Sequence, residues 1–254
     1  MNKKIEVGIG ILMIVFLIGG CKREEKHLSD EEATEIIRKF GNSNYEYIIT
    51  TFRTNNGQRE VVNEAEGVII AEPYEQYEKV IDSEAQGMTE QYWCNKNGDV
   101  EYYIAVQTNP EEKQWMLMGD DATKGSDLYS RNDLKFQFDR TEYILDNDVD
   151  VYQAKYQTTS SYQNNAENST EQTEITYTIT VEYFIESKTE KILQIGITND
   201  SGKEIEIMNQ MNIGMSQKEA EDFVEENGYE KVEQTIEIKK SGSDVKIPQL
   251  DITK

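Results

Sequence analysis

The stretch 175–185, Ile-Thr-Tyr-Thr-Ile-Thr-Val-Glu-Tyr-Phe-Ile, carries the clearest structural pattern in the chain. Its odd positions are apolar or aromatic, whereas its even positions are mostly threonine and glutamate. Successive side chains of a β-strand point to opposite faces, so the pattern predicts a strand with one buried face and one solvated face. Half-buried strands of this kind are typical of antiparallel sheets.

Similar alternation on both sides of this stretch predicts many further strands. We expect them at about 45–49, 60–71, 74–81, 89–94, 100–106, 115–117, 136–145, 149–158, 192–197, 204–211, 229–239 and 244–252. Asn55-Asn56-Gly57 and Asn95-Lys96-Asn97-Gly98-Asp99 are turn signals typical of hairpins. Pro248 cannot donate to a ladder, so the last strand is expected at an edge or a bulge. Residues 119–135 look irregular, with a short helix as one interpretation of 127–135.

Two helices are predicted by their start signals. Ser29 and Glu32 have the spacing of a capping box, and Ser216 and Glu219 repeat it. Gly41-Asn42 and Gly228 are the expected ends of the two helices. Apolar residues lie at helical spacing in both segments, namely Ala33, Ile36, Ile37 and Phe40 in the first and Ala220, Phe223 and Val224 in the second.

The fold class predicted from these elements is α+β and mainly β, with a large curved antiparallel sheet and a few helices covering its concave face. Residues 29–254 are expected to form a single domain, since strands of one kind lie on both sides of the polar stretch 158–174. We interpret 158–174 as a flexible hairpin loop, and a boundary between two domains is the alternative.

The N-terminus has the pattern of an export signal. Residues 1–20 begin with a lysine pair, continue with an apolar run from 7 to 18 and end in Gly19-Gly20 before Cys21. The run is shorter than the roughly 20 apolar residues that a spanning helix needs. Residues 18–21 resemble a bacterial lipobox, which implies cleavage, acylation of the Cys21 thiol with fatty acid such as palmitate, and a lipid anchor on the extracytoplasmic face of a cell membrane. The alternative is an N-terminal anchor helix with an incidental cysteine.

The charge of the chain limits its partners. The net charge is −23, and residues 1–20 hold two lysines and one glutamate, so without them the charge becomes −24. Nucleic-acid-binding proteins rely on lysine and arginine to contact phosphates. The strongly acidic charge of this chain therefore excludes the class of nucleic-acid-binding proteins. The charge also disfavours an anionic membrane surface, so attachment through the tether, residues 21–28, would rest on lipid at Cys21. Solubility and an acidic ligand patch both stay open as reasons for the charge.

Few residues suit catalysis or metal binding. The only histidine, His27, lies in the tether, so a serine or cysteine nucleophile lacks a base and a histidine-rich zinc site is excluded. Residues 146–150 resemble the start of a calcium loop, but positions 151 and 157 lack the required glycine and glutamate, which favours a solvated hairpin turn. Cys94 is interpreted as a small buried residue. We predict no catalytic, cofactor-binding or metal-ligating residue, and the one candidate site is Cys21, for lipidation.

Beyond residue 28 the order of elements resembles the LolA/LolB/LppX superfamily, and most of all LolA-like lipoproteins of Gram-positive bacteria. A helix comes first and a tyrosine-rich strand pair follows it. Residues at similar spacing carry the rest of the likeness, namely Glu66-Gly67, Pro73-Tyr74, Tyr92, Gly98, Tyr102, Trp115, the stretch 181–192 and Val245-Lys246-Ile247-Pro248. The resemblance implies an open half-barrel whose apolar concave face holds acyl chains, and therefore a lipid or other hydrophobic ligand.

Three functions stay open. The first is a membrane-anchored, non-enzymatic extracytoplasmic lipoprotein that binds a lipid or other hydrophobic ligand. The second is a surface interaction or sensory module without a cavity ligand, suggested by the charge and by the polar stretch 158–174. The third is a carboxylate-dependent glycan hydrolase, because aspartate and glutamate are abundant. No particular protein partner is indicated.

Overall fold

The computed structural model describes residues 27–55, 57–83, 88–109, 112–119, 133–163 and 172–252. Within these residues, one antiparallel sheet of eleven strands has the order β6-β5-β4-β3-β2-β1-β11-β10-β9-β8-β7. The strands are β1 (Tyr45–Asn55), β2 (Gln58–Ile70), β3 (Glu75–Ser83), β4 (Met88–Lys96), β5 (Asp99–Asn109), β6 (Glu112–Gly119), β7 (Gln137–Ile144), β8 (Asn147–Gln163), β9 (Gln172–Glu186), β10 (Lys191–Asn199) and β11 (Lys231–Ser241). The helices are α1 (Asp30–Gly41), α2 (Gly202–Asn212) and α3 (Gln217–Asn227).

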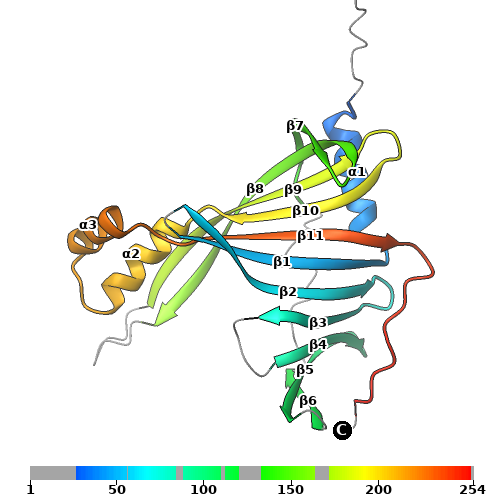
Figure 1. Cartoon of the computed structure of the whole chain (residues 1–254), viewed down its shortest axis with the longest axis horizontal. Coiled ribbons are helices and arrows are strands. Elements are labelled where there is room, and N and C mark those ends of the chain that lie inside the picture. Colours follow the sequence, from blue (N-terminus) through cyan, green and yellow to red (C-terminus); the bar gives the residue numbers. More distant parts are fainter. Residues whose placement is uncertain are drawn as a thin grey trace, which may run out of the picture.

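The sheet is built from two runs of hairpins that meet at its centre. Strands β1 to β6 form one run and β7 to β10 form the other, while β11 pairs with both β1 and β10. Figure 1 shows that the sheet is curved and that its edge strands, β6 and β7, lie far apart. The mainly β class and the large, curved, open antiparallel sheet expected from the sequence are confirmed.

The concave face of the sheet carries the main core. On β1, Tyr45 and Tyr47 are each 1% exposed and point to the same side. Helix α1 lies against this face and adds Ala33 and Ile37. Further large side chains of the same core come from both runs of strands, namely Ile69, Trp93, Tyr152, Tyr183, Ile185, Ile195 and Ile236. The alternation of residues in the sequence therefore predicts correctly which face of the strands is buried.

Both predicted capping boxes are present. Ser29 Oγ accepts a hydrogen bond from Glu32 N at 3.3 Å, and Ser216 Oγ accepts one from Glu219 N at 3.4 Å. Each box satisfies backbone groups that a helix start would otherwise leave unpaired, which stabilises the helix by about 1 kcal/mol. Helices α1 and α3 therefore begin where the sequence predicts.

The strand predicted at 204–211 is wrong, because this segment belongs to helix α2. Ile205 and Ile207 alternate with glutamates, which resembles a strand. In the structure, however, Ile205 and Met208 are three residues apart on one helical face and pack against Tyr177 of β9. The tertiary contact of Met208, which is 6% exposed, overrides the local strand pattern.

The strand predicted at 244–252 is also wrong. This C-terminal segment crosses the convex face of the sheet and forms no ladder with the described strands. Its apolar side chains instead cover a second, smaller core that contains Tyr77, Tyr103, Ala105 and Trp115, and the covering residues are Ile247, Leu250 and Ile252. Side-chain packing on an aromatic patch thus replaces the backbone pairing that Pro248 would in any case interrupt.

Both ends of the polar stretch 158–174, which the sequence predicts as a flexible loop, are strand instead. Strands β8 and β9 stay paired from Thr158↔Tyr177 to Gln163↔Gln172. The threonines in this stretch suit the extended backbone of a strand even where both faces are polar. Polar composition alone therefore does not mark a loop.

Several expectations fall outside the described residues. These are the signal segment 1–20, Cys21, the centre of the polar stretch at 164–171, and 120–132. Of the short helix considered near 127–135, only 133–135 is described, and it is not helical. Among the described residues, no helix is both long and apolar enough to cross a membrane.

Candidate functional site

The predicted tether is attached to the domain at its last two residues. His27 Nδ1 lies 2.9 Å from Asp150 Oδ1, and the His27 ring packs against Phe138 with a centroid distance of 4.5 Å. The hydroxyl of Tyr152 donates to the Leu28 carbonyl at 2.7 Å. His27 and Leu28, predicted as the end of the tether, therefore contact the domain directly.

Asp150 is the anchor of this contact. Its carboxylate is buried, with 2% of the residue exposed, and it accepts hydrogen bonds from Thr141 Oγ1 at 3.0 Å and from Ser187 Oγ. A buried carboxylate needs such donors to offset its lost hydration. His27 and Ser187 thus both bind the Asp150 carboxylate. In a catalytic triad, by contrast, the serine must lie within hydrogen-bond reach of the histidine. We call His27, Thr141, Asp150 and Ser187 the tether clamp.

Residues 146–150, which resemble the start of a calcium loop, lie partly in an exposed turn and partly in the buried tether clamp. Asp146 and Asp148 lie exposed at the β7–β8 turn, as the interpretation of a solvated turn expects. Asp150 instead points into the tether clamp. Among the described residues, no group of three or more histidine, cysteine, aspartate or glutamate side chains is placed to hold a metal ion.

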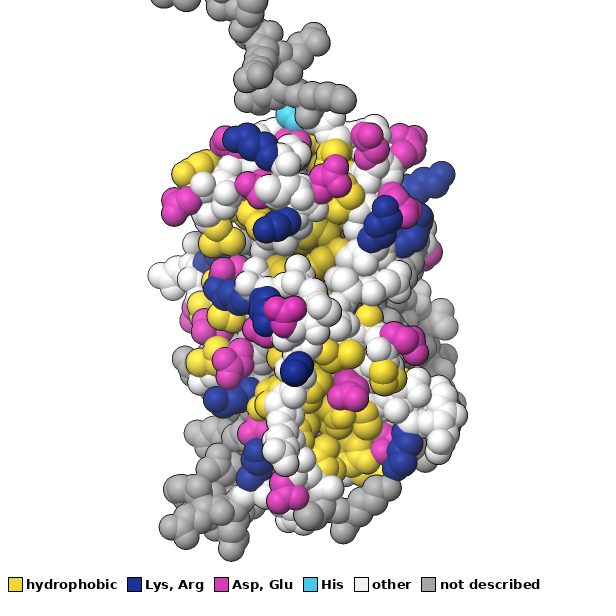
Figure 2. Space-filling view, turned by 90° about the vertical axis from the view of Figure 1, so that its right-hand side faces the viewer, with side chains coloured by type: hydrophobic (Ala, Val, Ile, Leu, Met, Phe, Trp, Pro, Cys, Tyr) yellow, Lys and Arg dark blue, Asp and Glu magenta, His cyan; other side chains and the backbone are white. Residues whose placement is uncertain are grey.

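A groove of about 730 Å³ opens between the C-terminal half of α1 and the neighbouring ends of β10 and β11. Its size lies in the range of small-molecule binding pockets. The apolar residues that line it are Ile36, Phe40, Ile192, Leu193 and Ile238. Figure 2 views this end of the domain and shows hydrophobic side chains at the bottom of a hollow in its upper part, with charged side chains around them. We call this feature the α1 groove.

The charged residues that line the α1 groove are Lys39, Lys191, Lys239, Lys240 and one glutamate, Glu190. This excess of lysine is unusual in a chain with 26 basic and 49 acidic residues. Lys239 donates to Glu237, and Lys240 donates to the Asp244 carbonyl. Lys191 forms no ion pair with any described residue, so its charge is available at the mouth of the groove. An apolar floor with a basic rim suits an amphipathic ligand.

A polar cluster lies on the concave face away from the α1 groove. Tyr47 Oη donates to Glu78 Oε1 at 2.5 Å, Gln76 Nε2 donates to the same oxygen at 2.8 Å, and Tyr74 Oη donates to Gln76 Oε1 at 2.6 Å. Burial raises the pKa of the Glu78 carboxyl, and the hydrogen bonds from Tyr47 and Gln76 partly oppose this shift. The concave face therefore contains a buried polar cluster within its otherwise apolar core where β1 and β3 lie near each other.

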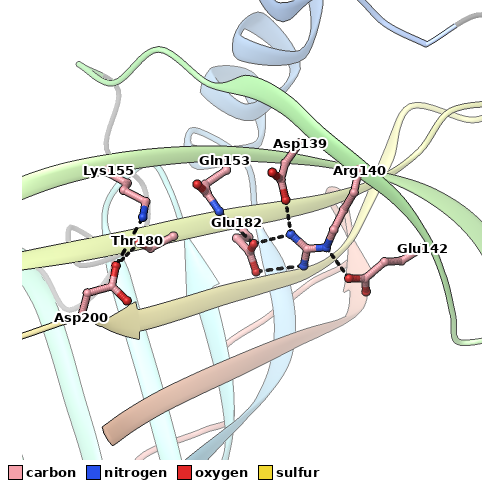
Figure 3. A network of polar contacts seen from close by, with 8 residues as sticks. All are labelled: Asp139, Arg140, Glu142, Gln153, Lys155, Thr180, Glu182 and Asp200. Atoms are coloured by element: carbon pink, nitrogen blue, oxygen red, sulfur yellow. Dashed lines mark hydrogen bonds and ion pairs between the residues drawn. The ribbon is translucent and has the colours of Figure 1, made fainter. Parts of the chain in front are cut away.

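The outer face of β7 to β9 carries an ion-pair network (Figure 3). Arg140 binds Glu182 through two nitrogens at 2.6 and 3.3 Å, and also contacts Glu142 and Asp139. The hydrogen bonds, that to Glu182 first, raise the pKa of the Arg140 guanidinium further above its already high value. The network joins edge strand β7 to β9 across β8. Its charges are already paired, which favours a structural role.

Cys94 lies half-buried next to the core that the C-terminal segment covers. Burial raises the pKa of its thiol, so the reactive thiolate is depleted at neutral pH. Cys94 is thus less buried than the sequence predicts, although it packs against an aromatic core. The single predicted site residue, Cys21, lies outside the described residues, and its lipidation stays a prediction.

No protein-family model matches the chain, and no curated protein matches its sequence. Among solved structures, the fold is similar to LprF from Mycobacterium bovis, with 9% identity, a TM-score of 0.40 and coverage of 88% of this chain and 99% of that one. It is also similar to a LolA superfamily protein from Nitrosomonas europaea, with 11% identity, a TM-score of 0.29 and coverage of 88% and 95%. A domain described as an outer membrane lipoprotein-sorting protein, from Vibrio parahaemolyticus, matches with 9% identity, a TM-score of 0.32 and coverage of 87% and 96%. Likenesses this distant leave the ligand to be argued from the residues of this chain.

Proposed function

We propose that this protein is an extracytoplasmic lipoprotein, anchored through Cys21, that binds a hydrophobic or amphipathic ligand in the α1 groove. The observation that carries the proposal is the combination of an apolar floor and a lysine-rich rim in one open groove. The anchor is supported by the lipobox-like residues 18–21 and by the short distance along the chain from Cys21 to the tether clamp.

The apolar floor is suited to an acyl chain. Ile36, Phe40 and Ile238 are partly exposed, although each packs against the main core. Covering such side chains removes apolar surface from water, and each buried methylene of a ligand contributes about 0.8 kcal/mol. Eight methylenes would then supply about 6 kcal/mol before the cost of ordering the ligand. A longer acyl chain therefore offsets more of the cost of association than a short one.

The basic rim favours an anionic head on that ligand. Lys39 lies on α1 and Lys191 on β10, so the two side chains approach the groove from its two walls. A carboxylate or phosphate placed between them would interact with both charges, in competition with Glu35, which lies 3.8 Å from Lys39 Nζ. The net negative charge of the rest of the chain opposes the approach of an anion, so the preference is confined to the rim itself.

Native mass spectrometry of the lipidated protein, purified from its membrane, tests for a co-purifying ligand. Binding of a fluorescent long-chain fatty acid then locates the site. Ile36→Glu introduces a carboxylate into the groove, and we expect at least a tenfold loss of affinity because an acyl chain would have to desolvate it. Ile213→Glu is the matched control, since Ile213 lies on the α2–α3 connection and is 75% exposed. Equal affinity of the two variants, with both folded, would refute the α1 groove as the site.

A further inference from the structure

The tip of the β7–β8 hairpin exposes two large apolar side chains. Tyr143 is 67% exposed and Leu145 is 50% exposed. Figure 1 shows β7 close to the start of α1, and the hydrogen bond from Phe138 N to Asp30 Oδ1, at 2.8 Å, joins the two elements. Strand β7 therefore begins on the side of the domain where the tether is attached.

Leu145 occupies a turn position that disfavours its side chain. The turn residues Leu145 and Asp146 have φ values of 47° and 62°, so both adopt the left-handed conformation. Two-residue hairpin turns of this kind favour asparagine, aspartate and glycine, whereas a bulky residue there is an outlier. Leu145 is also half exposed, so core packing does not account for its presence. A strained apolar residue at an exposed tip points to contact with something outside the domain.

The tether clamp places this tip near the proposed lipid anchor. Thr141 binds the same Asp150 oxygen that His27 faces. Tyr143 and Leu145 follow Thr141 by two and four residues, about 7 and 13 Å along an extended chain. Cys21 precedes His27 by six residues, which span at most about 20 Å. A bilayer that holds the Cys21 lipid is thus within reach of the hairpin tip.

We propose that Tyr143 and Leu145 insert at the membrane interface and form a second contact beside the lipid on Cys21. This inference rests on the proposed lipid anchor. Tyrosine has an apolar ring and a polar hydroxyl, which suits the headgroup level of a bilayer, and leucine suits the adjacent acyl region. With two contacts, the tether and the hairpin, the domain has a defined orientation on the membrane.

The charges around the hairpin tip determine which lipids the tip binds. Asp146 and Asp148 lie exposed in the hairpin, and Glu142 lies beside Tyr143. Anionic lipids repel these carboxylates, and salt screens the repulsion. The contact is therefore strongest on zwitterionic lipid, and on partly anionic lipid it strengthens as salt is added.

A fluorescent reporter at the tip tests this contact. The lipidated full chain carrying Cys94→Ser and Leu145→Cys is labelled with an environment-sensitive dye and incorporated into phosphatidylcholine vesicles. We expect a blue-shifted emission that brominated phosphatidylcholine quenches, and a smaller shift when phosphatidylglycerol is added at low salt. The control is Ile213→Cys in the same background, because Ile213 is more exposed than Leu145 and lies by the α2–α3 pair at the opposite end of the domain.

Two negative results are distinguishable. If the wild-type chain does not co-float with vesicles, the lipid anchor is refuted and the hairpin contact with it. If the labelled chain co-floats but the dye at position 145 emits as in water, only the hairpin contact is refuted and the anchor stands. Equal quenching at positions 145 and 213 would also overturn the proposal, because it would show no preferred orientation.

Discussion

The ring of Tyr47 lies in the space that a side chain at Gly67 would occupy on the neighbouring strand. A Cβ at position 67 would stand 2.2 Å from Tyr47 Cζ, far inside contact distance. The two residues are partners in the β1–β2 ladder, and this close approach lets the Tyr47 hydroxyl reach Glu78 on β3. Glycine at position 67 is therefore required by the polar cluster and not by backbone conformation.

Gly67→Ala should destabilise the domain by about 1–3 kcal/mol, because the added methyl must displace the buried Tyr47 ring. Urea unfolding measures this loss. Gly119→Ala is the matched control, since no atom lies within 4 Å of a Cβ built there. The double variant Gly67→Ala/Tyr47→Ala should lose less unfolding free energy than the two single variants lose together. Strict additivity of the two losses would contradict the proposed contact.

Glu78→Gln should change how stability depends on pH. Burial raises the pKa of Glu78 in the folded state, so the folded state holds a proton that the unfolded chain has already released. The contribution of Glu78 to stability should therefore fall as pH rises from about 4.5, its unperturbed value, through the raised pKa. Glutamine keeps an oxygen acceptor for Tyr47 and Gln76 but cannot ionise.

The measurement is the difference in unfolding free energy between Glu78→Gln and wild type across this pH range. We expect the difference to grow in favour of the glutamine variant as pH rises. The other carboxylates are the same in both proteins, so their contributions cancel in the difference. A difference independent of pH would show that Glu78 titrates normally. Glu204→Gln on α2, an exposed glutamate, serves as the control for the substitution itself.

His27→Ala should release the tether from the domain. The loss of its contact with Asp150 should lower stability by about 1 kcal/mol or less, because His27 is partly exposed. Trypsin cleavage after Lys26 should accelerate several-fold, since the adjoining residue is no longer held. His27→Gln, whose amide can still donate to Asp150, should cleave more slowly than His27→Ala. Equal cleavage of wild type and His27→Ala would contradict the tether clamp.

Leu145→Asn should raise stability, because asparagine tolerates the left-handed conformation that leucine adopts here. A gain of about 1 kcal/mol is expected from the relieved strain. Thermal unfolding of the soluble Cys21→Ala chain measures it without interference from lipid. Val61→Asn on β2, a substitution at another half-exposed apolar residue, should bring no such gain. A loss of stability would mean that the Leu145 side chain packs against the domain, and its proposed role in membrane contact would lose support.

Local patterns predicted most strands and two of the three helices among the described residues. Alternation of apolar and polar residues predicted the strands because one face of the sheet is buried, and the serine–glutamate pairs predicted the helix starts. Helix α2 was missed because its burial depends on Tyr177, 31 residues before Met208 in the chain. The C-terminal segment was misread because its apolar residues pack on a distant aromatic patch rather than in a ladder.

The candidate site could be predicted only in part. The α1 groove combines residues from α1 with residues of β10 and β11, some 150 to 200 positions later, and no local motif reports such proximity. The sequence does contain one signal of the tether clamp. Asp150 stands between Val149 and Val151, so a carboxylate interrupts an otherwise buried run and implies a partner.

The central position of β11 has a consequence for biogenesis. Residues 231–241 bridge the two hairpin runs, so an emerging chain holds two separate partial sheets until β11 is available. Each partial sheet then presents an unpaired edge, β1 on one and β10 on the other, which is a template for aggregation. Contacts this distant in sequence also slow folding. A protein of this topology that crosses a membrane as an unfolded chain completes its sheet only after β11 has crossed, and β1 and β10 need protection until then.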